Sequence, residues 1–302
     1  MPKTILVLLV GSTDHGAETD HYQLLQEESA IAEARKAAVN AEIVFAPGFD
    51  HLRVIRKRLG DTGAPPIDAV VVEPGSVAAT GLILKELKGK TGLVLLNAWS
   101  AEVEQYANGW SDKLPFGTVS VDHTRLGQIQ GKQISSLLPQ GGQVLCVTGP
   151  QRSSAAAERL AGLKSAVRKD VTIYETGAGG WTESDGAAAF DSWYGLFKTR
   201  NFTVDVIAAQ SDELAIGARN ACESVTNPAH RALLLKARFL GVDACPAFGR
   251  RLVDEGKLTA SVTMPANTAE AIRALRRFWE SGQALPLKAY TEPQAYPPSS
   301  AR

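Results

Sequence analysis

Residues 204–225, VDVIAAQSDELAIGARNACESV, show the pattern from which most of this chain is built. The apolar run over 204–209 is continuous rather than alternating, which predicts a strand covered by helices on both faces. Ser211 is of a residue type that favours the N-cap position, and the spacing that follows predicts a helix over 211–225. The stretch is therefore one strand–helix unit of an α/β fold with a parallel sheet.

The same alternation recurs along the chain at intervals of about 25–35 residues, which is the period of βαβ units. Continuous apolar runs predict further strands at 4–10, 42–46, 67–73, 92–97, 143–148, 171–175 and 237–242. Helices are expected at about 21–38, 50–59, 75–88, 124–137, 154–168, 183–198, 245–255 and 267–281. The last of these opens with Asn267-Thr-Ala-Glu270, which is a capping-box pattern.

The series of units is interrupted once. Residues 98–117 are rich in Trp, Gly, Asn and Ser, and a new series begins near Val119. The interruption predicts two doubly wound lobes, one made of residues 1–119 plus 265–290 and the other of 120–264 plus 291–302. Strands near 119–121, 263–266 and 288–292 are expected to cross between the lobes and form a hinge.

Composition excludes several classes of function. Lys plus Arg and Asp plus Glu number 32 each, so the formal net charge is zero and predicts neither a nucleic-acid partner nor insertion into a membrane. The apolar run at 4–10 is too short for a membrane span and is interpreted as a buried strand. As written, the sequence has no export signal, which predicts a cytoplasmic location, or a periplasmic one if an upstream signal was removed. Three widely spaced cysteines suggest no disulfide framework.

Motifs of common enzymes are not found. Gly11–Gly16 follows a strand, but Ala17-Glu18 stands where a phosphate-binding loop has Lys-Ser/Thr. His15 with His21 as a metal pair, and Asp14 with Asp20 as an acid–base pair, are alternatives to ordinary polar residues of a loop. We therefore expect no catalytic residue, no cofactor and no bound metal, and predict that the chain is not an enzyme.

Four segments in order resemble the type I periplasmic sugar-binding proteins, whose fold is shared by lactose-repressor-like regulators. They are Gln210–Ala221 (QSDELAIGARNA), Leu240–Asp243 with Arg251–Pro265, Val121–Gly131 (VDHTRLGQIQG), and Ser153–Arg159 with Gly162–Ala166. The resemblance covers nearly the whole chain. It implies the type I periplasmic-binding-protein fold, with a ligand cleft between two lobes.

Ligands of open α/β sheets bind beyond the carboxyl ends of the strands, and this places the candidate site residues. Asp243 ends a strand and is expected to accept hydrogen bonds from the ligand, with helix capping as the alternative. Ser211 suits the N-cap of the following helix as well as it suits contact with the ligand. Asp212 is expected to organise the loop in which it lies. The complete set of candidates is Asp243, Trp181, Asn97, Trp99, Ser211, Asp212, Arg152, Tyr22, Asp20 and Met264.

Three departures from the family pattern affect the predicted ligand. Asn97-Ala98 stands where the family commonly has Asp-Arg, Ala157 where we place a ligand-binding Arg, and Met264 where the family has Gln. Arg152 is the candidate substitute for one missing cation. We therefore predict that common pentoses and hexoses bind more weakly than about 100 μM.

The function predicted from the sequence is reversible binding of a small sugar-like or polar solute, with hinge closure, for transport or sensing. A membrane permease or a sensor protein would then be the partner. The alternative is a cytosolic ligand-sensing module without a DNA-binding domain, because no helix-turn-helix precedes the strand at 4–10. An enzyme on a similar scaffold is a third, less favoured hypothesis.

Overall fold

The computed structural model describes residues 2–11, 20–74, 76–200 and 202–298. The chain divides into two compact units, and each is discontinuous in sequence. Unit 1 comprises Met1–Ala17, Tyr22–Val121 and Ala266–Thr291. Unit 2 comprises Glu18–His21, Asp122–Pro265 and Glu292–Arg302.

Unit 1 contains a six-stranded sheet in the order β11-β5-β4-β3-β1-β2, in which every pairing is parallel. The strands are β1 (Thr4–Val10), β2 (Asn40–Ala46), β3 (Ala69–Val72), β4 (Gly92–Leu96), β5 (Phe116–Val121) and β11 (Ala289–Thr291). β3 and β4 are buried along their full length, as their continuous apolar sequences predict.

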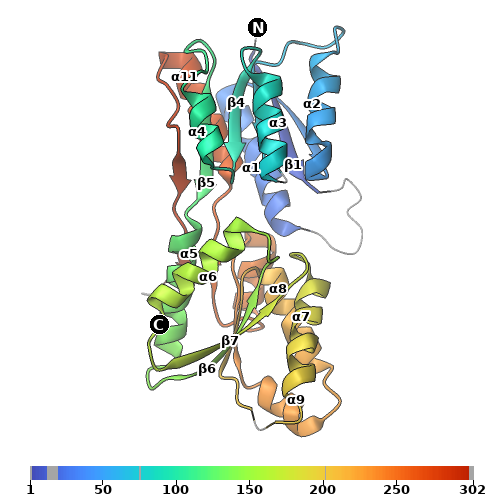
Figure 1. Ribbon diagram of the computed structural model, residues 1–302, viewed down its shortest axis with the longest axis vertical. Coiled ribbons are helices and arrows are strands. Elements are labelled where there is room, and N and C mark those ends of the chain that lie inside the picture. Colours follow the sequence, from blue (N-terminus) through green and yellow to red (C-terminus); the bar gives the residue numbers. More distant parts are fainter. Residues whose placement is uncertain (1, 12–19, 75, 201, 299–302) are drawn as a thin grey trace. The chain divides into compact units, whose positions relative to one another are not determined.

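Helices cover both faces of this sheet (Figure 1). The helices α1 (His21–Ala37) and α11 (Asn267–Ser281) pack on the face that carries Ile5 and Val7. The opposite face, which carries Leu6 and Leu8, is covered by α2 (His51–Leu59), α3 (Val77–Leu87) and α4 (Ala101–Ala107). A short 3₁₀ turn, η1 (Gly48–Asp50), precedes α2.

Unit 2 contains a four-stranded parallel sheet in the order β7-β6-β8-β9. Its strands are β6 (Gly142–Thr148), β7 (Val171–Gly177), β8 (Val206–Ala209) and β9 (Arg238–Leu240). A separate pair, β10 (Ser261–Thr263) and β12 (Gln294–Tyr296), is antiparallel. The expectation that all strands are parallel is therefore wrong for this pair, which joins two distant segments of unit 2.

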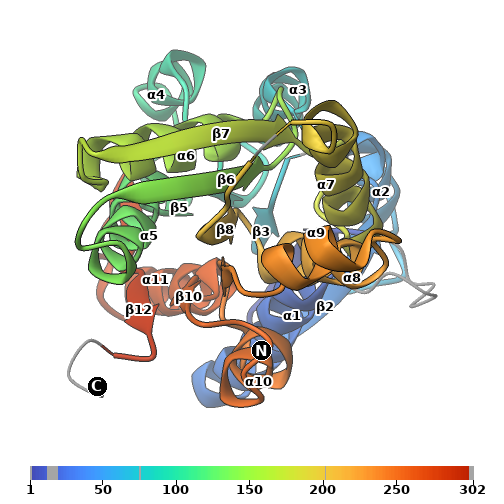
Figure 2. The ribbon, with the colours of Figure 1, turned by 90° about the horizontal axis from the view of Figure 1, so that it is seen from below.

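The helices of unit 2 also form two layers (Figure 2). One layer consists of α5 (His123–Leu137) and α6 (Ser154–Ala166), which pack on Val144 and Cys146. The other consists of α7 (Glu183–Phe197), α8 (Asp212–Glu223), α9 (Pro228–Leu234) and the π-helical η2 (Pro246–Arg250), which continues into α10 (Arg251–Asp254).

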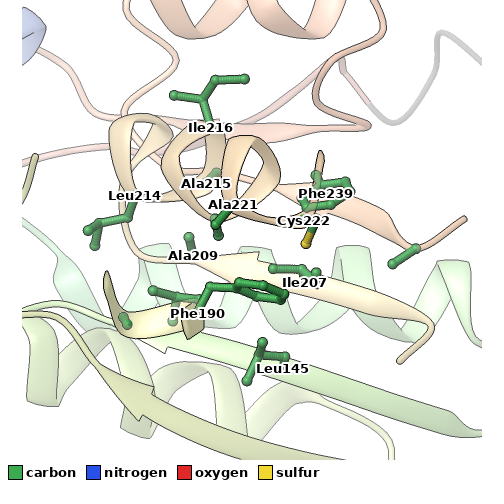
Figure 3. Packing of buried hydrophobic residues seen from close by; sticks show 14 of the residues in the cluster. Leu145, Phe190, Ile207, Ala209, Leu214, Ala215, Ile216, Ala221, Cys222 and Phe239 are labelled. Carbon is green, nitrogen blue, oxygen red and sulfur yellow. The ribbon is translucent and has the colours of Figure 1, made fainter. Parts of the chain in front are cut away.

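Large apolar side chains fill the space between the sheet of unit 2 and this second layer (Figure 3). Phe190 of α7 and Phe239 of β9 are fully buried there with Leu145, Ile207 and Leu214. Each such side chain contributes about 1.5–3 kcal/mol when it leaves water. This core holds the ends of β6, β8 and β9 in fixed relative positions.

Two glycines allow α5 and α6 to approach each other closely. A Cβ atom on Gly127 would collide with the backbone oxygen of Arg159, and one on Gly162 would collide with that of Thr124. The contact therefore depends on the absence of side chains at both positions. It also fixes the part of α6 from which the Arg159 side chain extends.

The predicted elements agree with the structure to within a few residues, with α4 and α9 as additions. The capping box at Asn267 is wrong: Ala266 is the N-cap residue and makes no side-chain cap. Asn267 instead donates to Asn97 Oδ1 at 2.8 Å, and Glu270 pairs with Arg273 and Arg277. No helix in the described residues has the length and apolar content to cross a membrane.

Candidate ligand-binding site

Polar residues of unit 2 gather where its strands end. Gln210, Ser211 and Asp212 follow β8, Asp243 follows β9 by three residues, and Met264 follows β10 directly. The carboxyl ends of parallel strands are where open α/β sheets bind ligands. The sequence-based choice of these segments therefore corresponds to one edge of the unit.

Asp243 is the most unusual residue of this group. Only 6% of it is exposed, and its Oδ1 has no hydrogen-bond partner among the described residues. Its φ is 100° and that of Ala244 is 43°, a backbone region that costs free energy for residues other than glycine. Burial raises the pKa of the Asp243 carboxyl, Arg159 opposes this, and Glu213 and Asp212 add to it.

Arg159 supplies a buried cation to the same group of residues. The residue is 5% exposed. Its guanidinium donates to the backbone oxygen of Gln210, to Nδ1 of His123 at 3.3 Å and to the sulfur of Met264 at 3.1 Å. The guanidinium also lies over the ring of Trp181, 5.2 Å from its centre. These contacts orient the side chain within unit 2.

The structure corrects the sequence interpretation of this helix. We placed the missing guanidinium of the family pattern at Ala157, but Ala157 is exposed on α6. The buried guanidinium comes from Arg159, two residues further along. Arg152, the proposed substitute, lies exposed in the turn before α6. The spacing from Arg159 to Gly162, whose contact with α5 fixes this turn of α6, is the signal that would have identified Arg159.

Asp212 and Ser211 hold their own loop together. The Asp212 carboxylate accepts from Ala244 N at 2.7 Å and from Ser261 Oγ at 2.6 Å. Ser211 Oγ accepts from Leu214 N at 3.1 Å and caps α8. Asp212 therefore supports the segment that carries Asp243, and Ser211 fixes the start of α8. Burial raises the pKa of Asp212, and the nearby Glu213 adds to this.

The remaining candidates of unit 2 surround this centre. Trp181 is half-buried, and its ring occupies the space beside Gly149 where a Cβ would lie. Asp20 is exposed, and its charge contributes to raising the pKa of Asp243. His21, the next residue, donates from Nδ1 to Glu213 Oε1 at 3.0 Å and stacks on Phe248 with ring centres 3.8 Å apart.

Unit 1 has its own polar group at the carboxyl ends of its strands. Asn97, with φ of 50°, donates to Glu73 Oε1 at 2.8 Å, and Gln23 donates to Glu73 Oε2 at 3.0 Å. Asn97 Oδ1 accepts from Ser120 Oγ at 3.3 Å and from Asn267. Glu73 was not among the site residues predicted from the sequence, although its position directly after an apolar run could have identified it.

Two further predicted residues belong to unit 1. Tyr22 is buried, and its hydroxyl accepts from Gln26 Nε2 at 3.2 Å. Trp99 is 37% exposed and has Lys288 Nζ 5.0 Å from its ring centre. The metal and acid–base alternatives involve His15 and Asp14, which lie outside the described residues, as do all residues from 12 to 19.

Polar residues at the carboxyl ends of two parallel α/β sheets are the arrangement in which open α/β folds bind ligands. The chain belongs to the periplasmic binding protein domain family, whose sequence model matches residues 19–280. This confirms the resemblance and the fold class. The family consists of binding proteins and not of enzymes. No curated protein matches the sequence.

Solved structures of similar fold cover almost the whole chain. A periplasmic solute-binding protein of an ABC transporter from Actinobacillus succinogenes, with bound D-allose, superposes with a TM-score of 0.79 at 18% identity, over 97% of this chain and 96% of that one. A galactofuranose-binding protein gives 0.76 at 20% identity, over 99% and 96%. A solute-binding protein from Bacillus halodurans with bound myo-inositol gives 0.75 at 18%, over 99% and 95%.

Proposed function

We propose that this protein is a receptor that binds a small polyhydroxylated solute reversibly and releases it unchanged. The observation that carries the proposal is the buried Oδ1 of Asp243, which has no partner in the described part of the chain. A buried polar atom without a hydrogen bond destabilises the protein, and a bound molecule that donates to the atom removes this cost. A carboxylate oxygen accepts, and hydroxyl groups donate to it.

The residues around Asp243 suit a ring with hydroxyl groups. Trp181 offers an aromatic face to C–H groups, and Arg159 places a positive charge beside the carboxylate. Glu73 and Asn97 form a second polar set at the strand ends of unit 1. Two of the relatives named above are solved with D-allose or myo-inositol, which are polyhydroxylated rings. Closing of the two lobes around such a ring stays a prediction.

Whether the protein serves transport or sensing depends on its partner protein, and two relatives illustrate these two roles. The Actinobacillus protein serves an ABC transporter, whereas a further structure of similar fold is the fructose-binding periplasmic domain of a hybrid two-component system. We favour transport through a membrane permease and action outside the cytoplasm. Fractionation of cells that express the full natural gene tests the location.

A thermal-shift screen with sugars, polyols, nucleosides and amino acids tests the proposed function. A ligand at about 100 times its dissociation constant stabilises the native state by about 2.7 kcal/mol. We expect a polyhydroxylated compound to do so, and Asp243→Ala to abolish the shift. The matched control is Asp191→Ala on the exposed side of α7, which should keep it. A shift produced only by nucleosides or amino acids, or an undiminished shift in Asp243→Ala, would overturn the proposal.

A further inference from the structure

We propose that the ligand is a cationic polyol, in which an ammonium group takes the place of one hydroxyl and pairs with Asp243. The inference rests on the proposed function, because it names the class of solute that binds at the same carboxylate. Three observations support it: the balance of buried charge in unit 2, the donors already used there, and the lack of a metal-binding group of side chains among the described residues.

Buried negative charge exceeds buried positive charge around Asp243. The residues Asp212, Glu213 and Asp243 are 1%, 5% and 6% exposed, and Asp20 adds a fourth carboxylate at the surface. Arg159 is the only lysine or arginine among the buried residues that the structure describes. Asp212 is satisfied by two hydrogen bonds and Glu213 by His21, whereas Asp243 Oδ1 has no partner within the same residues.

Arg159 does not satisfy the unpaired oxygen of Asp243. Its guanidinium donates to Gln210 O, His123 Nδ1 and Met264 Sδ. The positive charge of Arg159 lowers the pKa of Asp243, yet Oδ1 still lacks a donor in the described part of the chain. A buried carboxylate oxygen without a donor is costly, and an ammonium group would supply both the charge and the N–H.

Met264 strengthens the preference for a ligand that brings its own donors. Its sulfur is a weak acceptor and cannot donate, unlike the amide that the family pattern has at this position. The sulfur already accepts from Arg159 at 3.1 Å. At this point unit 2 offers a carboxylate oxygen and a thioether in place of an amide N–H. A ligand rich in donors fits this set better than one that needs donors from the protein.

A metal ion would be the other way to balance the charge. However, no group of three or more His, Cys, Asp or Glu side chains within the described ranges is arranged to hold one. Asp212 is also occupied by Ala244 N and Ser261 Oγ. An ammonium group needs only one unpaired oxygen and a few neighbouring acceptors. The geometry therefore favours an organic cation.

Calorimetric titration at pH 7 with matched pairs tests the inference. The pairs are glucosamine with glucose, galactosamine with galactose, mannosamine with mannose, and an aminodeoxyinositol with myo-inositol. The neutral N-acetyl derivatives of the three amino sugars control for size. We expect at least one amino compound to bind about 10-fold or more tightly than its neutral parent and its acetylated form, which corresponds to about 1.4 kcal/mol.

The variant Asp243→Asn keeps the shape of the side chain and removes its charge. It should reduce the ratio of the two affinities to near 1, whereas Asp191→Asn should leave the ratio as it is. Neutral parents that bind as tightly as their amino counterparts would overturn the inference and leave the proposed function standing. A ratio that survives in Asp243→Asn would also overturn it. Binding of no compound in the panel would count against both.

Discussion

Nε of Arg159 donates to Nδ1 of His123 across 3.3 Å, in a part of unit 2 from which water is nearly excluded. An imidazole nitrogen accepts only while it carries no proton, so this contact requires a neutral His123. Burial and the charge of Arg159 both favour the neutral form and lower the pKa of His123 to about 2. The pair is therefore a fixed cation beside a neutral acceptor from pH 4 to pH 8.

The first prediction concerns the titration of His123. Between pH 4 and pH 8 its ring should stay neutral, because its pKa in the folded protein is about 2. The NMR shifts of its ring carbons should therefore not change over this range. Since the unfolded chain takes up the proton near pH 6.5, His123 alone should reduce the free energy of unfolding by about 1.4 kcal/mol per pH unit below pH 6. A midpoint between pH 5 and 7 for this ring would contradict the pairing with Arg159.

Arg159 should be important for both stability and binding. Its removal leaves the Gln210 oxygen and His123 without their donor and Asp243 without a neighbouring positive charge. Arg159→Ala should therefore lower the free energy of unfolding by about 2–3 kcal/mol and abolish the thermal shift given by ligand. Arg152→Ala, in the exposed turn before α6, should change stability by less than about 0.5 kcal/mol. Equal losses in the two variants would show that Arg159 is not the buried anchor described above.

Asp243→Asn should stabilise the free protein while it weakens binding. Burial raises the pKa of this carboxyl in the folded state, so at pH 7 the wild-type carboxyl costs folding free energy that a neutral amide does not. A gain of about 1–2 kcal/mol in the free energy of unfolding is expected at pH 7. The gain should shrink as the pH falls toward the pKa of an unfolded Asp, about 3.9, because the wild-type carboxyl is then neutral in both the folded and the unfolded state. Denaturant melts at pH 7 and pH 4.5 compare the two proteins, and a loss of stability at pH 7 would refute the expectation.

The contact between α5 and α6 gives a test of packing. Gly162→Ala would place a Cβ against the backbone oxygen of Thr124, and we expect it to destabilise the protein by about 1–3 kcal/mol. Gly195 lies on the exposed side of α7, where an added Cβ would meet no described atom within 4 Å, which makes it a matched control. Gly195→Ala should stabilise the helix by about 0.5–1 kcal/mol. Thermal melts of both variants distinguish a packing effect from the general helix preference of alanine.

Much of the fold could be predicted from sequence because the parallel strands are buried on both faces. The runs that form β1, β4 and β8 are continuously apolar, and the family and fold class that they suggested are confirmed. The short strands β10 and β12 could not be located in this way. Each has three residues, and their pairing joins segments about 30 positions apart in sequence.

The site was less accessible to sequence reasoning, since position along a helix does not show which side chain is buried. Ala157 and Arg159 are two residues apart on α6, yet only Arg159 points into the unit, because Gly127 and Gly162 set how α6 rests on α5. Asn267 looked like part of a helix cap, whereas tertiary contacts with Asn97 and Thr291 use its side chain. Glu73 is recognised as part of the polar group only from the structure, in which the side-chain amides of Gln23 and Asn97 both donate to its carboxylate.

The division of unit 1 into distant segments has a consequence for how the chain matures as it leaves the ribosome. The strands β1 to β5 emerge first, but the apolar face that includes Ile5, Val7 and Val94 is covered in part by Ile272 and Leu275 of α11. Most of unit 2 is continuous from Asp122 to Pro265 and is synthesised before that helix. The core of unit 2 is thus able to form before α11 is synthesised, whereas the apolar face of unit 1 stays partly uncovered until then. This reverses the usual order, in which the N-terminal part of a chain folds first. A nascent chain that ends before residue 267 would therefore leave this apolar face partly uncovered.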